Sequence, residues 1–191
     1  PQSEAGQALR APILARLRKN ELKRYAFGID TRAGRRIVKI SEATTFGNRL
    51  VGLLGSTARR EHKFHRRTDS LGLAASRSLG FLELRRGPLL VRGLHVQTVV
   101  DPGRELFETA FQREFERDPK KALESFAQSL ARVHARGFFH ADLKGFHVYI
   151  DPRGLTFIDL GRVGFRMSRR RRIINLYQAL RFMVPPEPQA Q

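Results

Sequence analysis

Two aspartates around a short predicted hairpin are the feature that most constrains this chain. The segment FFHADLK, residues 138–144, places Asp142 in a loop with apolar flanks. Strands are predicted next over residues 147–150 and 155–158, and the second strand ends directly on Asp159. A carboxylate at the edge of an apolar core is costly unless it is compensated. Taken alone, Asp142 is better explained as a helix cap or turn residue, and the second acid is what favours a functional role for both.

If both acids face one cleft, they have the chemistry needed for phosphoryl transfer. One could accept the proton of a hydroxyl group, and the other could hold a magnesium ion, which prefers oxygen ligands and shares them with phosphates. Lys39 would then neutralise the phosphates of a nucleotide, and Glu61 would orient Lys39. Lys144, two residues after Asp142, could reach the transferred phosphoryl group.

The first half of the chain predicts a small antiparallel sheet with one helix. Strands over residues 24–29 and 35–40 flank a turn, and a charged helix follows over residues 57–71. Two further strands are predicted over residues 78–84 and 88–94, with a turn-like Arg-Arg-Gly between them. A sheet of four or five strands is the most economical arrangement.

Within these elements, Lys39 and Glu61 are the candidates for a nucleotide site. Period-two alternation places Ile37 and Lys39 on one face of their strand, so Ile37 joins the lysine as a candidate nucleotide contact. Glu61 lies on the inward-leaning edge of the predicted helix. Taken alone, Lys39 is more simply explained as an exposed charge on a half-solvated strand.

The second half is predicted to be mostly helical, with helices over residues 105–117 and 120–136 ahead of the hairpin. A run of four arginines begins a last helix, whose apolar residues we expect to pack: Ile173, Ile174, Leu176, Tyr177 and Leu180. The predicted domain organisation is a tail with a basic amphipathic helix over 1–22, a first lobe over 23–98, a second lobe over 99–184 and a tail over 185–191.

The formal charge of +18 predicts attraction to anions. It arises from 36 Lys and Arg residues against 18 Asp and Glu, and arginine suits bidentate contacts with phosphate. Nucleic acid, anionic lipid and phosphorylated substrates are all candidates on charge alone. The absence of cysteine excludes disulfides and thiolate metal sites, and no apolar run approaches the roughly 18 residues that span a bilayer. We therefore expect a cytoplasmic protein that meets a membrane only at its surface.

Four motifs in the same order resemble those of protein kinases. His140–His147, HADLKGFH, resembles the catalytic loop H-R-D-L-K-x-x-N, and Asp159–Gly161, DLG, resembles the metal-binding motif D-F-G. Ile37–Lys39, IVK, is similar to the strand motif V-A-I-K, and Glu61 lies at the distance expected of the helix glutamate that pairs with that lysine. The resemblance implies an α+β, protein-kinase-like fold of two lobes. A small antiparallel sheet with one helix would form the first lobe, and a reduced, mostly helical lobe would follow.

Within that superfamily the chain resembles the lipopolysaccharide kinase (Kdo/WaaP) family, bacterial enzymes that phosphorylate sugars of the lipopolysaccharide inner core. The compact chain, the histidine-ended loop, the segment IDLGR and the arginine-rich helix carry this likeness over residues 25–182. It implies that Asp142 is the base or hydroxyl-orienting residue and that Asp159 binds magnesium. It also implies that Lys39 and Glu61 form an ion pair and that ATP is the donor. The acceptor would be a sugar hydroxyl of lipopolysaccharide or a similar anionic glycolipid, at the inner face of the cytoplasmic membrane.

Departures from the kinase pattern keep a second interpretation open. His147 stands where most protein kinases have asparagine, and imidazole is a poor magnesium ligand. His147 is therefore as well explained by a hydrogen-bonded brace as by a metal ligand. Neither Gly28 nor Gly34 lies in a G-x-G-x-x-G context, so the usual phosphate-binding loop is missing before the lysine. A kinase-like pseudoenzyme that binds phosphate or other anions is the alternative, whereas nucleic-acid binding rests on charge alone and is not expected.

Overall fold

The computed structural model describes residues 22–151 and 154–183. These residues form two compact units, made of residues 22–63 with 78–99 and of residues 64–77 with 100–183. The helix α4, Thr57–Ser70, contributes to both units. Apart from Leu22, the predicted N-terminal amphipathic helix lies outside the described residues, and so does the predicted C-terminal tail. None of the described helices is both long and apolar enough to cross a bilayer.

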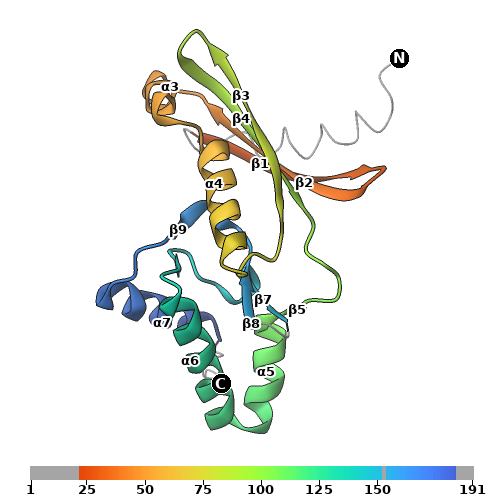
Figure 1. The fold of residues 1–191 in the computed structure, drawn as a ribbon, viewed down its shortest axis with the longest axis vertical. Helices are drawn as coiled ribbons and strands as arrows, with labels where there is room; N and C mark the ends of the chain where they lie inside the picture. The colour runs from red at the N-terminus through yellow and green to blue at the C-terminus, as the bar shows by residue number, and fades with distance from the viewer. Residues whose placement is uncertain (1–21, 152–153, 184–191) are drawn as a thin grey trace, which may run out of the picture. The chain divides into compact units, whose positions relative to one another are not determined.

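The first unit is built on a four-stranded antiparallel sheet in the order β1-β2-β4-β3 (Figure 1). Both predicted hairpins are confirmed, and every strand is longer than predicted: β1 Leu22–Thr31, β2 Gly34–Ala43, β3 Ser78–Arg86 and β4 Leu89–Thr98. Lys39 of β2 lies opposite His95 of β4, which lies opposite Phe81 of β3. Directly opposed residues share a face of the sheet, so these three side chains form one row across it.

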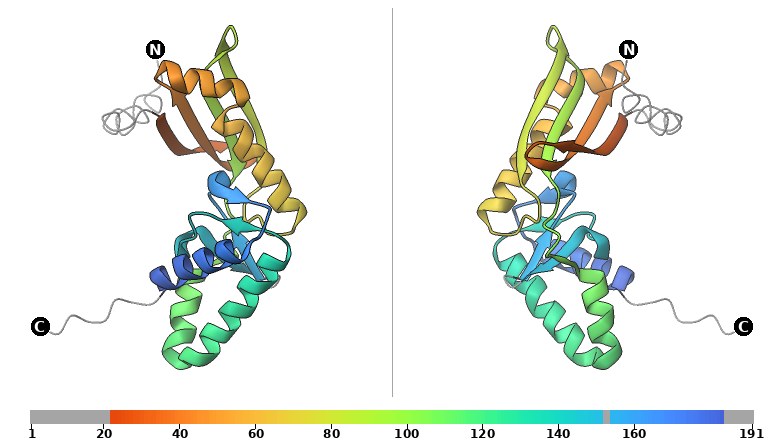
Figure 2. Two further views of the ribbon diagram at one scale, coloured as in Figure 1. Left: turned by 90° about the vertical axis from the view of Figure 1, so that its left-hand side faces the viewer. Right: turned by 90° about the vertical axis from the view of Figure 1, so that its right-hand side faces the viewer.

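The first half of α4 packs on that face of the sheet, as the side views of Figure 2 show. The helix predicted for residues 57–71 is confirmed to within one residue. Close packing needs a glycine at position 93, because a Cβ there would lie 3.1 Å from the Cβ of Ala58. Further along α4, Glu61 is buried and the ring centroid of His62 lies 5.2 Å from that of Phe81. The predicted inward position of Glu61 is confirmed.

A short helix and a 3-10 turn, which no sequence signal indicated, connect β2 to α4. These are α3, Phe46–Val51, and η1, Gly52–Leu54. Thr45 caps α3, since its hydroxyl oxygen accepts a hydrogen bond from the N–H of Asn48 at 3.2 Å. No residue of α3 is buried, so no apolar face of this helix is packed into the core.

Two helices and a two-residue strand open the main part of the second unit. They are β5, Glu105–Leu106, α5, Phe107–Arg117, and α6, Pro119–Ala135. Three phenylalanines join the helices, because the ring of Phe107 lies 5.6 Å from that of Phe111 and 5.2 Å from that of Phe126. The helix predicted from Glu105 begins two residues later, because Glu105 and Leu106 pair with strand β7, Val148–Asp151.

The end of α6 is set by a glycine, as predicted. Gly137 follows the helix with a φ of +77°, a conformation that residues with a Cβ rarely adopt. The carboxylate of Asp118 accepts a hydrogen bond from the N–H of Lys121 at the other end, where Pro119 is the first helical residue. The prediction of residues 120–136 is thus confirmed to within one residue at each end.

The predicted hairpin around the two aspartates is confirmed as β7, Val148–Asp151, and β8, Gly154–Phe157, which form a sheet in the order β5-β7-β8. Two short strands, β6, Phe139–His140, and β9, Val163–Gly164, pair separately. The 3-10 turns η2, Gly145–His147, and η3, Leu160–Arg162, precede β7 and β9. Buried residues of the second unit form the main core, among them Phe111, Phe126, Leu130, Phe138, Leu143, Phe157 and Leu160.

The last helix, α7, Arg169–Met183, packs by a different face from the one predicted. Asn175 and Ala179 are its buried residues among those described, and Leu180 is half-buried. The other apolar residues expected to pack are exposed: Ile173 at 60%, Ile174 at 36%, Leu176 at 41% and Tyr177 at 63%. The prediction is wrong because the buried Asn175 side chain finds hydrogen-bond partners on the main chain of the second unit.

Candidate active site

The segment that carries Asp142 is fixed by main-chain pairing within the second unit. His140 pairs with Val163 between β6 and β9, and the N–H of Ala141 donates to the carbonyl oxygen of Arg162 at 2.7 Å. On the other side, the N–H of His147 donates to the carbonyl oxygen of Lys144 at 2.9 Å. Main-chain hydrogen bonds alone therefore hold both ends of the loop.

The side chain of His140 links the two aspartate-bearing segments. Its Nδ1 accepts a hydrogen bond from the N–H of Asp142 at 3.3 Å, and its Nε2 donates to the carbonyl oxygen of Ile158, the residue before Asp159, at 3.2 Å. This pair of bonds requires a neutral imidazole with its proton on Nε2. Burial lowers the pKa of His140 to about 4, outweighing the carbonyl of Ile158, which raises it. The ring is therefore neutral at neutral pH and holds both segments in register.

Asp142 and Lys144 lie beside each other at the surface of the loop. The Nζ of Lys144 lies 3.4 Å from Oδ1 of Asp142, and both side chains are about one-third exposed. The chain is tightly packed directly after Lys144, at Gly145, where a Cβ would lie 2.9 Å from the Cβ of Glu108. A carboxylate and an ammonium group that are both accessible to solvent can act on a bound substrate, so the two predicted catalytic residues are brought together.

Asp159 has an uncommon main-chain conformation. Its φ of 53° and ψ of 54° lie in the left-handed region, and among the described residues no other non-glycine has a positive φ. Aspartate tolerates this region better than most residues, and such conformations concentrate at functional sites. The side chain is exposed at the start of η3. Its carboxylate is thus presented at the surface directly after the buried strand β8, as a cation ligand would be.

His147 braces the catalytic loop through one ring nitrogen. Its Nδ1 donates to the carbonyl oxygen of Asp142 at 2.9 Å, and the N–H of Ile158 donates to the carbonyl oxygen of His147 itself at the same distance. With the proton on Nδ1, a neutral ring keeps a lone pair on Nε2. The brace predicted as one of two roles is therefore present, and only Nε2 could serve the other role, that of a metal ligand.

Helix α7 holds the same loop from a second direction, through two residues that were not predicted to belong to the site. The side-chain nitrogen of Asn175 donates to the carbonyl oxygen of His140 at 2.6 Å, and its oxygen accepts from the N–H of His140 at 3.3 Å. The side-chain nitrogen of Gln178 donates to the carbonyl oxygen of Ala141 at 2.8 Å. An asparagine among isoleucines and leucine in a helix was the available hint, since a polar residue there needs a partner if it is buried.

In the first unit, the predicted pair of Lys39 and Glu61 is formed. The Nζ of Lys39 donates a hydrogen bond to Oε1 of Glu61, and the side chains are 21% and 7% exposed. Ile37, the third predicted nucleotide contact, is half-buried on β2, opposite Gln97 of β4. A buried carboxylate that faces an ammonium group fixes the direction of the lysine side chain.

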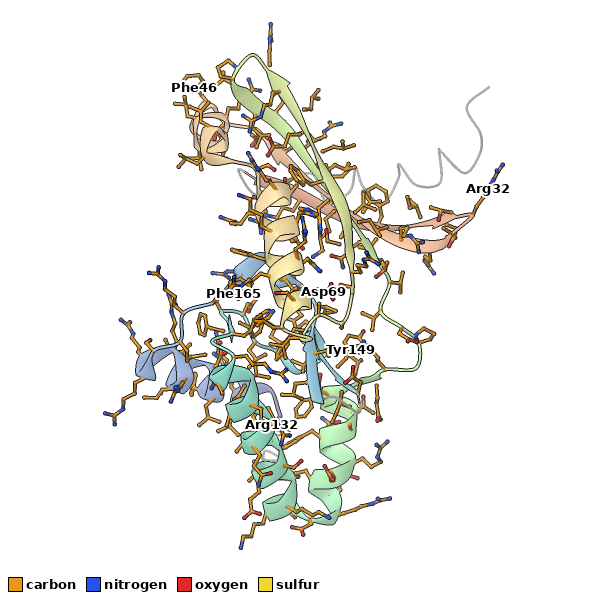
Figure 3. The ribbon with its side chains drawn as sticks, viewed as in Figure 1. Arg32, Phe46, Asp69, Arg132, Tyr149 and Phe165 are labelled. Atoms are coloured by element: carbon orange, nitrogen blue, oxygen red, sulfur yellow. The ribbon has the colours of Figure 1, made fainter. Side chains whose placement is uncertain are left out.

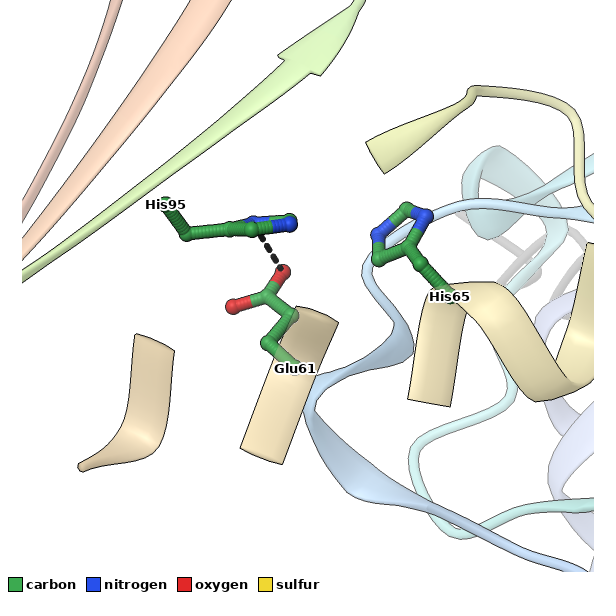
Figure 4. A group of neighbouring side chains, drawn as sticks. All are labelled: Glu61, His65 and His95. Carbon is green, nitrogen blue, oxygen red and sulfur yellow. Dashed lines mark ion pairs between the residues drawn. The ribbon is translucent and has the colours of Figure 1, made fainter. Parts of the chain in front are cut away.

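His95 extends this ion pair across the sheet. Its Nδ1 lies 3.8 Å from Oε1 of Glu61, and its Nε2 forms a 2.8 Å hydrogen bond with the hydroxyl of Ser78, which in turn contacts Nδ1 of His62 at 2.8 Å. Figure 4 shows the ion pair of Glu61 with His95, and His65 one helical turn further along α4. The position of His95 directly opposite Lys39 was not evident from the sequence, since it depends on the register of β2 and β4.

The predicted site residues thus form one group in each unit. In the second unit, an ion pair joins Lys144 to Asp142, and hydrogen bonds join Asp142 to His147 and to the segment before Asp159. In the first unit, Lys39 is joined to Glu61. A model of the "Lipopolysaccharide kinase (Kdo/WaaP) family" matches residues 46–191.

The chain belongs to the lipopolysaccharide kinase (Kdo/WaaP) family. Among solved structures it is similar to "WaaP in complex with acyl carrier protein", with a TM-score of 0.56 and 22% identity over 93% of this chain and 78% of that one. It also matches "monomeric WbdD" with a TM-score of 0.45 and 20% identity, over 80% of this chain and 36% of that one. Comparison with curated proteins gives no match. Membership of the family and the likeness to WaaP confirm the predicted kinase-like α+β fold, and the family is one of kinase-type phosphotransferases.

Proposed function

We propose that this lipopolysaccharide kinase family member is an active, ATP-dependent enzyme. It transfers the γ-phosphoryl group of ATP to a sugar hydroxyl of the lipopolysaccharide inner core or of a similar glycolipid. In this step the hydroxyl oxygen forms a bond to the γ-phosphorus, the bond from that phosphorus to the bridging oxygen of ADP breaks, and Asp142 accepts the hydroxyl proton.

The observation that carries the proposal is the neutral His140 that joins the two aspartate segments. One ring bonds the main chain of Asp142 on one side and that of Ile158 on the other, so the base and the residue before Asp159 keep a fixed relation. Phosphoryl transfer depends on such positioning more than on covalent chemistry by the protein. The Nζ of Lys144, 3.4 Å from Oδ1 of Asp142, adds a positive charge that would act on the transferred phosphoryl group beside the attacking hydroxyl.

The chain offers suitable groups for both ATP and magnesium. The exposed carboxylate of Asp159 is the hard oxygen donor that magnesium prefers, whereas the imidazole of His147 is a weaker one. We therefore assign the metal to Asp159, with Nε2 of His147 as a second donor. Lys39, oriented by Glu61, is the group that would bind the nucleotide phosphates. When bound, the metal would neutralise charge on the phosphates of ATP.

The acceptor we propose is anionic and displayed at a membrane. The +18 charge of the chain favours attraction to phosphorylated sugars and to anionic lipid headgroups. We accordingly propose a cytoplasmic location with peripheral contact at the inner face of the cytoplasmic membrane.

Phosphate transfer from radiolabelled ATP to core lipopolysaccharide, in the presence of magnesium, tests the proposal. Asp142→Asn should lower turnover at least about 100-fold, the usual contribution of a general base, and Asp159→Ala should abolish the turnover that magnesium supports. The control is Asp69→Asn, an exposed acid on α4 (Figure 3), which should behave as the original chain. Turnover that survives both site substitutions would overturn the assignment.

The transfer assay, combined with a nucleotide-binding measurement, distinguishes an active kinase from a pseudoenzyme. The pseudoenzyme remains an alternative because His147 replaces asparagine and the glycine-rich motif before Lys39 is missing. A pseudoenzyme would bind phosphate-rich ligands without transferring phosphate. If the chain binds no nucleotide with magnesium, manganese or calcium, yet retains anionic ligands, the pseudoenzyme is favoured and the kinase proposal is rejected.

A further inference from the structure

The short connection between β2 and α4 presents an unusual set of exposed apolar side chains. In this nine-residue stretch, α3 followed by η1, the exposed fractions are Leu54 93%, Phe46 66%, Val51 66%, Leu53 51% and Leu50 42%. Single exposed apolar residues are ordinary, but a contiguous group of five marks a contact surface. We call these five residues the α3–η1 surface. Figure 3 shows Phe46 at the outer edge of α3.

The backbone beneath this surface is firmly held within the first unit. Gly52 lies so close to β4 that a Cβ there would be 2.3 Å from the Cβ of Leu90. The guanidinium of Arg85 donates to the carbonyl oxygen of Gly52 at 3.0 Å, and Thr45 caps the start of α3. The apolar side chains therefore project from a backbone that is held in place, and a binding partner could bury them.

Charge indicates the kind of partner. Residues 43–60 contain three arginines and no acidic residue, and two of them, Arg59 and Arg60, are exposed on α4. The acids nearest in sequence on the adjoining strands are already in ion pairs, Glu42 with Arg92 and Glu83 with Arg85. An apolar tip with arginines beside it matches the boundary between acyl chains and anionic headgroups.

We propose that the α3–η1 surface inserts into the headgroup region of an anionic membrane. Leu53 and Leu54 enter the apolar layer, while Arg59 and Arg60 contact anionic headgroups. A second copy of this chain suits the surface less well, because a two-fold contact would bring the same arginines together.

The α3–η1 surface would make the peripheral membrane contact that the proposed function includes, and to that extent this proposal rests on it. Vesicle binding can nevertheless be measured without ATP and therefore without phosphate transfer. If the protein binds vesicles through these leucines but transfers no phosphate, the membrane surface is supported and the kinase proposal is rejected. If it transfers phosphate but does not bind vesicles through these leucines, the kinase proposal is supported and the membrane surface is rejected.

A fluorescent probe at position 54 tests insertion directly. The chain contains no cysteine, so Leu54→Cys can be labelled with an environment-sensitive dye in the otherwise unchanged full chain. The matched control is Leu82→Cys on β3, where the native leucine is 69% exposed. On phosphatidylcholine vesicles containing phosphatidylglycerol, the dye at position 54 should shift to shorter wavelength and gain intensity, and the dye at position 82 should not. Vesicles without phosphatidylglycerol should give a weaker response that salt does not change.

Flotation with unlabelled variants gives the second measurement. The change Leu53→Ser with Leu54→Ser should weaken vesicle partitioning at least about tenfold, the effect of removing a single leucine side chain from an apolar phase, whereas Leu82→Ser should leave it unchanged. Equal binding by the two variants would overturn the proposal. So would a blue-shifted dye at position 54 before vesicles are added, because the surface would then already be covered by a second copy or by another part of the chain. Sedimentation velocity of the same sample identifies which of these occurs.

Discussion

The side chain of Asn175 bonds both main-chain groups of His140, donating to its carbonyl oxygen at 2.6 Å and accepting from its N–H at 3.3 Å. Asn175 is 2% exposed, and its amide also contacts Nε2 of His134 at 3.4 Å and donates to Oε1 of Gln178 at 3.2 Å. His140 in turn bonds the main chain of Asp142 and of Ile158. Helix α7 therefore positions the candidate base through two successive hydrogen-bonded residues.

Replacing Asn175 with alanine should loosen this arrangement. The buried N–H and carbonyl groups of His140 would lose their partner, which costs about 1–3 kcal/mol of the free energy of unfolding. We expect kcat to fall with little change in the KM for ATP, because Asn175 positions the base and contacts no substrate. Urea unfolding and steady-state kinetics measure the two effects.

The control for this prediction is Gln112→Ala, an exposed amide on α5 that should change neither quantity. A fall in stability with an unchanged kcat per folded molecule would mean that Asn175 supports the fold alone. Asn175→Asp adds a finer comparison, since it keeps the acceptor for the N–H of His140 and loses the donor for its carbonyl oxygen. It should be less stable than the original chain for that reason.

The buried imidazole of His140 should make stability depend on pH. Burial lowers its pKa to about 4 in the folded chain, whereas an unfolded chain takes up the proton near pH 6.5. Between these values the unfolded state binds more protons, so stability is complete above about pH 6.5 and is lost as the pH falls toward about 4. The loss from this residue amounts to about 3 kcal/mol.

Urea unfolding of the original chain and of His140→Gln, at several pH values in metal-free buffer, isolates this effect. Glutamine does not titrate, so the stability difference between the two proteins should shrink by that amount from pH 7 to pH 4. The pKa of His134 is also lowered by burial, but it titrates in both proteins and cancels from the difference. A difference that stays constant with pH would contradict the assigned neutral imidazole.

The ion pair of Lys39 and Glu61 should matter for stability and turnover separately. Lys39→Met leaves the carboxylate of Glu61, 7% exposed, without its ammonium partner, which should cost about 3 kcal/mol or more. Adding Glu61→Leu removes the buried charge and should restore much of the stability. Neither protein should transfer phosphate, because both lack the cation assigned to the nucleotide.

Arg92→Ala provides the matched control, since it breaks another ion pair of the same sheet, with Glu42. The side chain of Arg92 is 51% exposed and that of Glu42 is 25% exposed. Because solvent screens this pair, the change should cost less than about 1 kcal/mol of the free energy of unfolding and leave turnover intact. If Lys39→Met and Arg92→Ala lower stability and turnover equally, the pair of Lys39 and Glu61 has no special role.

Elements with strong local periodicity were predictable from the sequence. The β1–β2 hairpin, helix α4 and helix α6 combine regular apolar spacing with turn or cap residues such as Gly34 and Gly137. The positions of the loop around Asp142 and of the hairpin before Asp159 along the chain were predictable for the same reason. Local signals succeed there because each element is stabilised mainly by residues close in sequence.

Features that depend on distant partners could not be predicted in this way. Glu105 and Leu106 have a helical pattern, yet they form β5 because they meet Ile150 and Tyr149 of β7. The orientation of α7 is a second case, since satisfying Asn175 on the main chain of His140 outweighs burying the four apolar side chains that remain exposed. His95 is a third, because its place opposite Lys39 follows from strand register.

His147 has two proposed roles in the loop, as a brace and as a metal ligand, and its substitution separates them. Nδ1 donates to the carbonyl oxygen of Asp142 at 2.9 Å. His147→Ala removes this brace together with Nε2, so turnover should fall with any metal. His147→Asn replaces the nitrogen donor by an amide that offers both an oxygen ligand and an N–H donor.

We therefore expect His147→Asn to change metal preference rather than to abolish activity. An imidazole donor favours manganese over magnesium, and an amide oxygen favours magnesium. The ratio of magnesium-supported to manganese-supported turnover should rise several-fold in His147→Asn relative to the original chain. An unchanged ratio would mean that Nε2 does not contact the metal and that His147 acts only as a brace, leaving Asp159 as the single protein ligand assigned here.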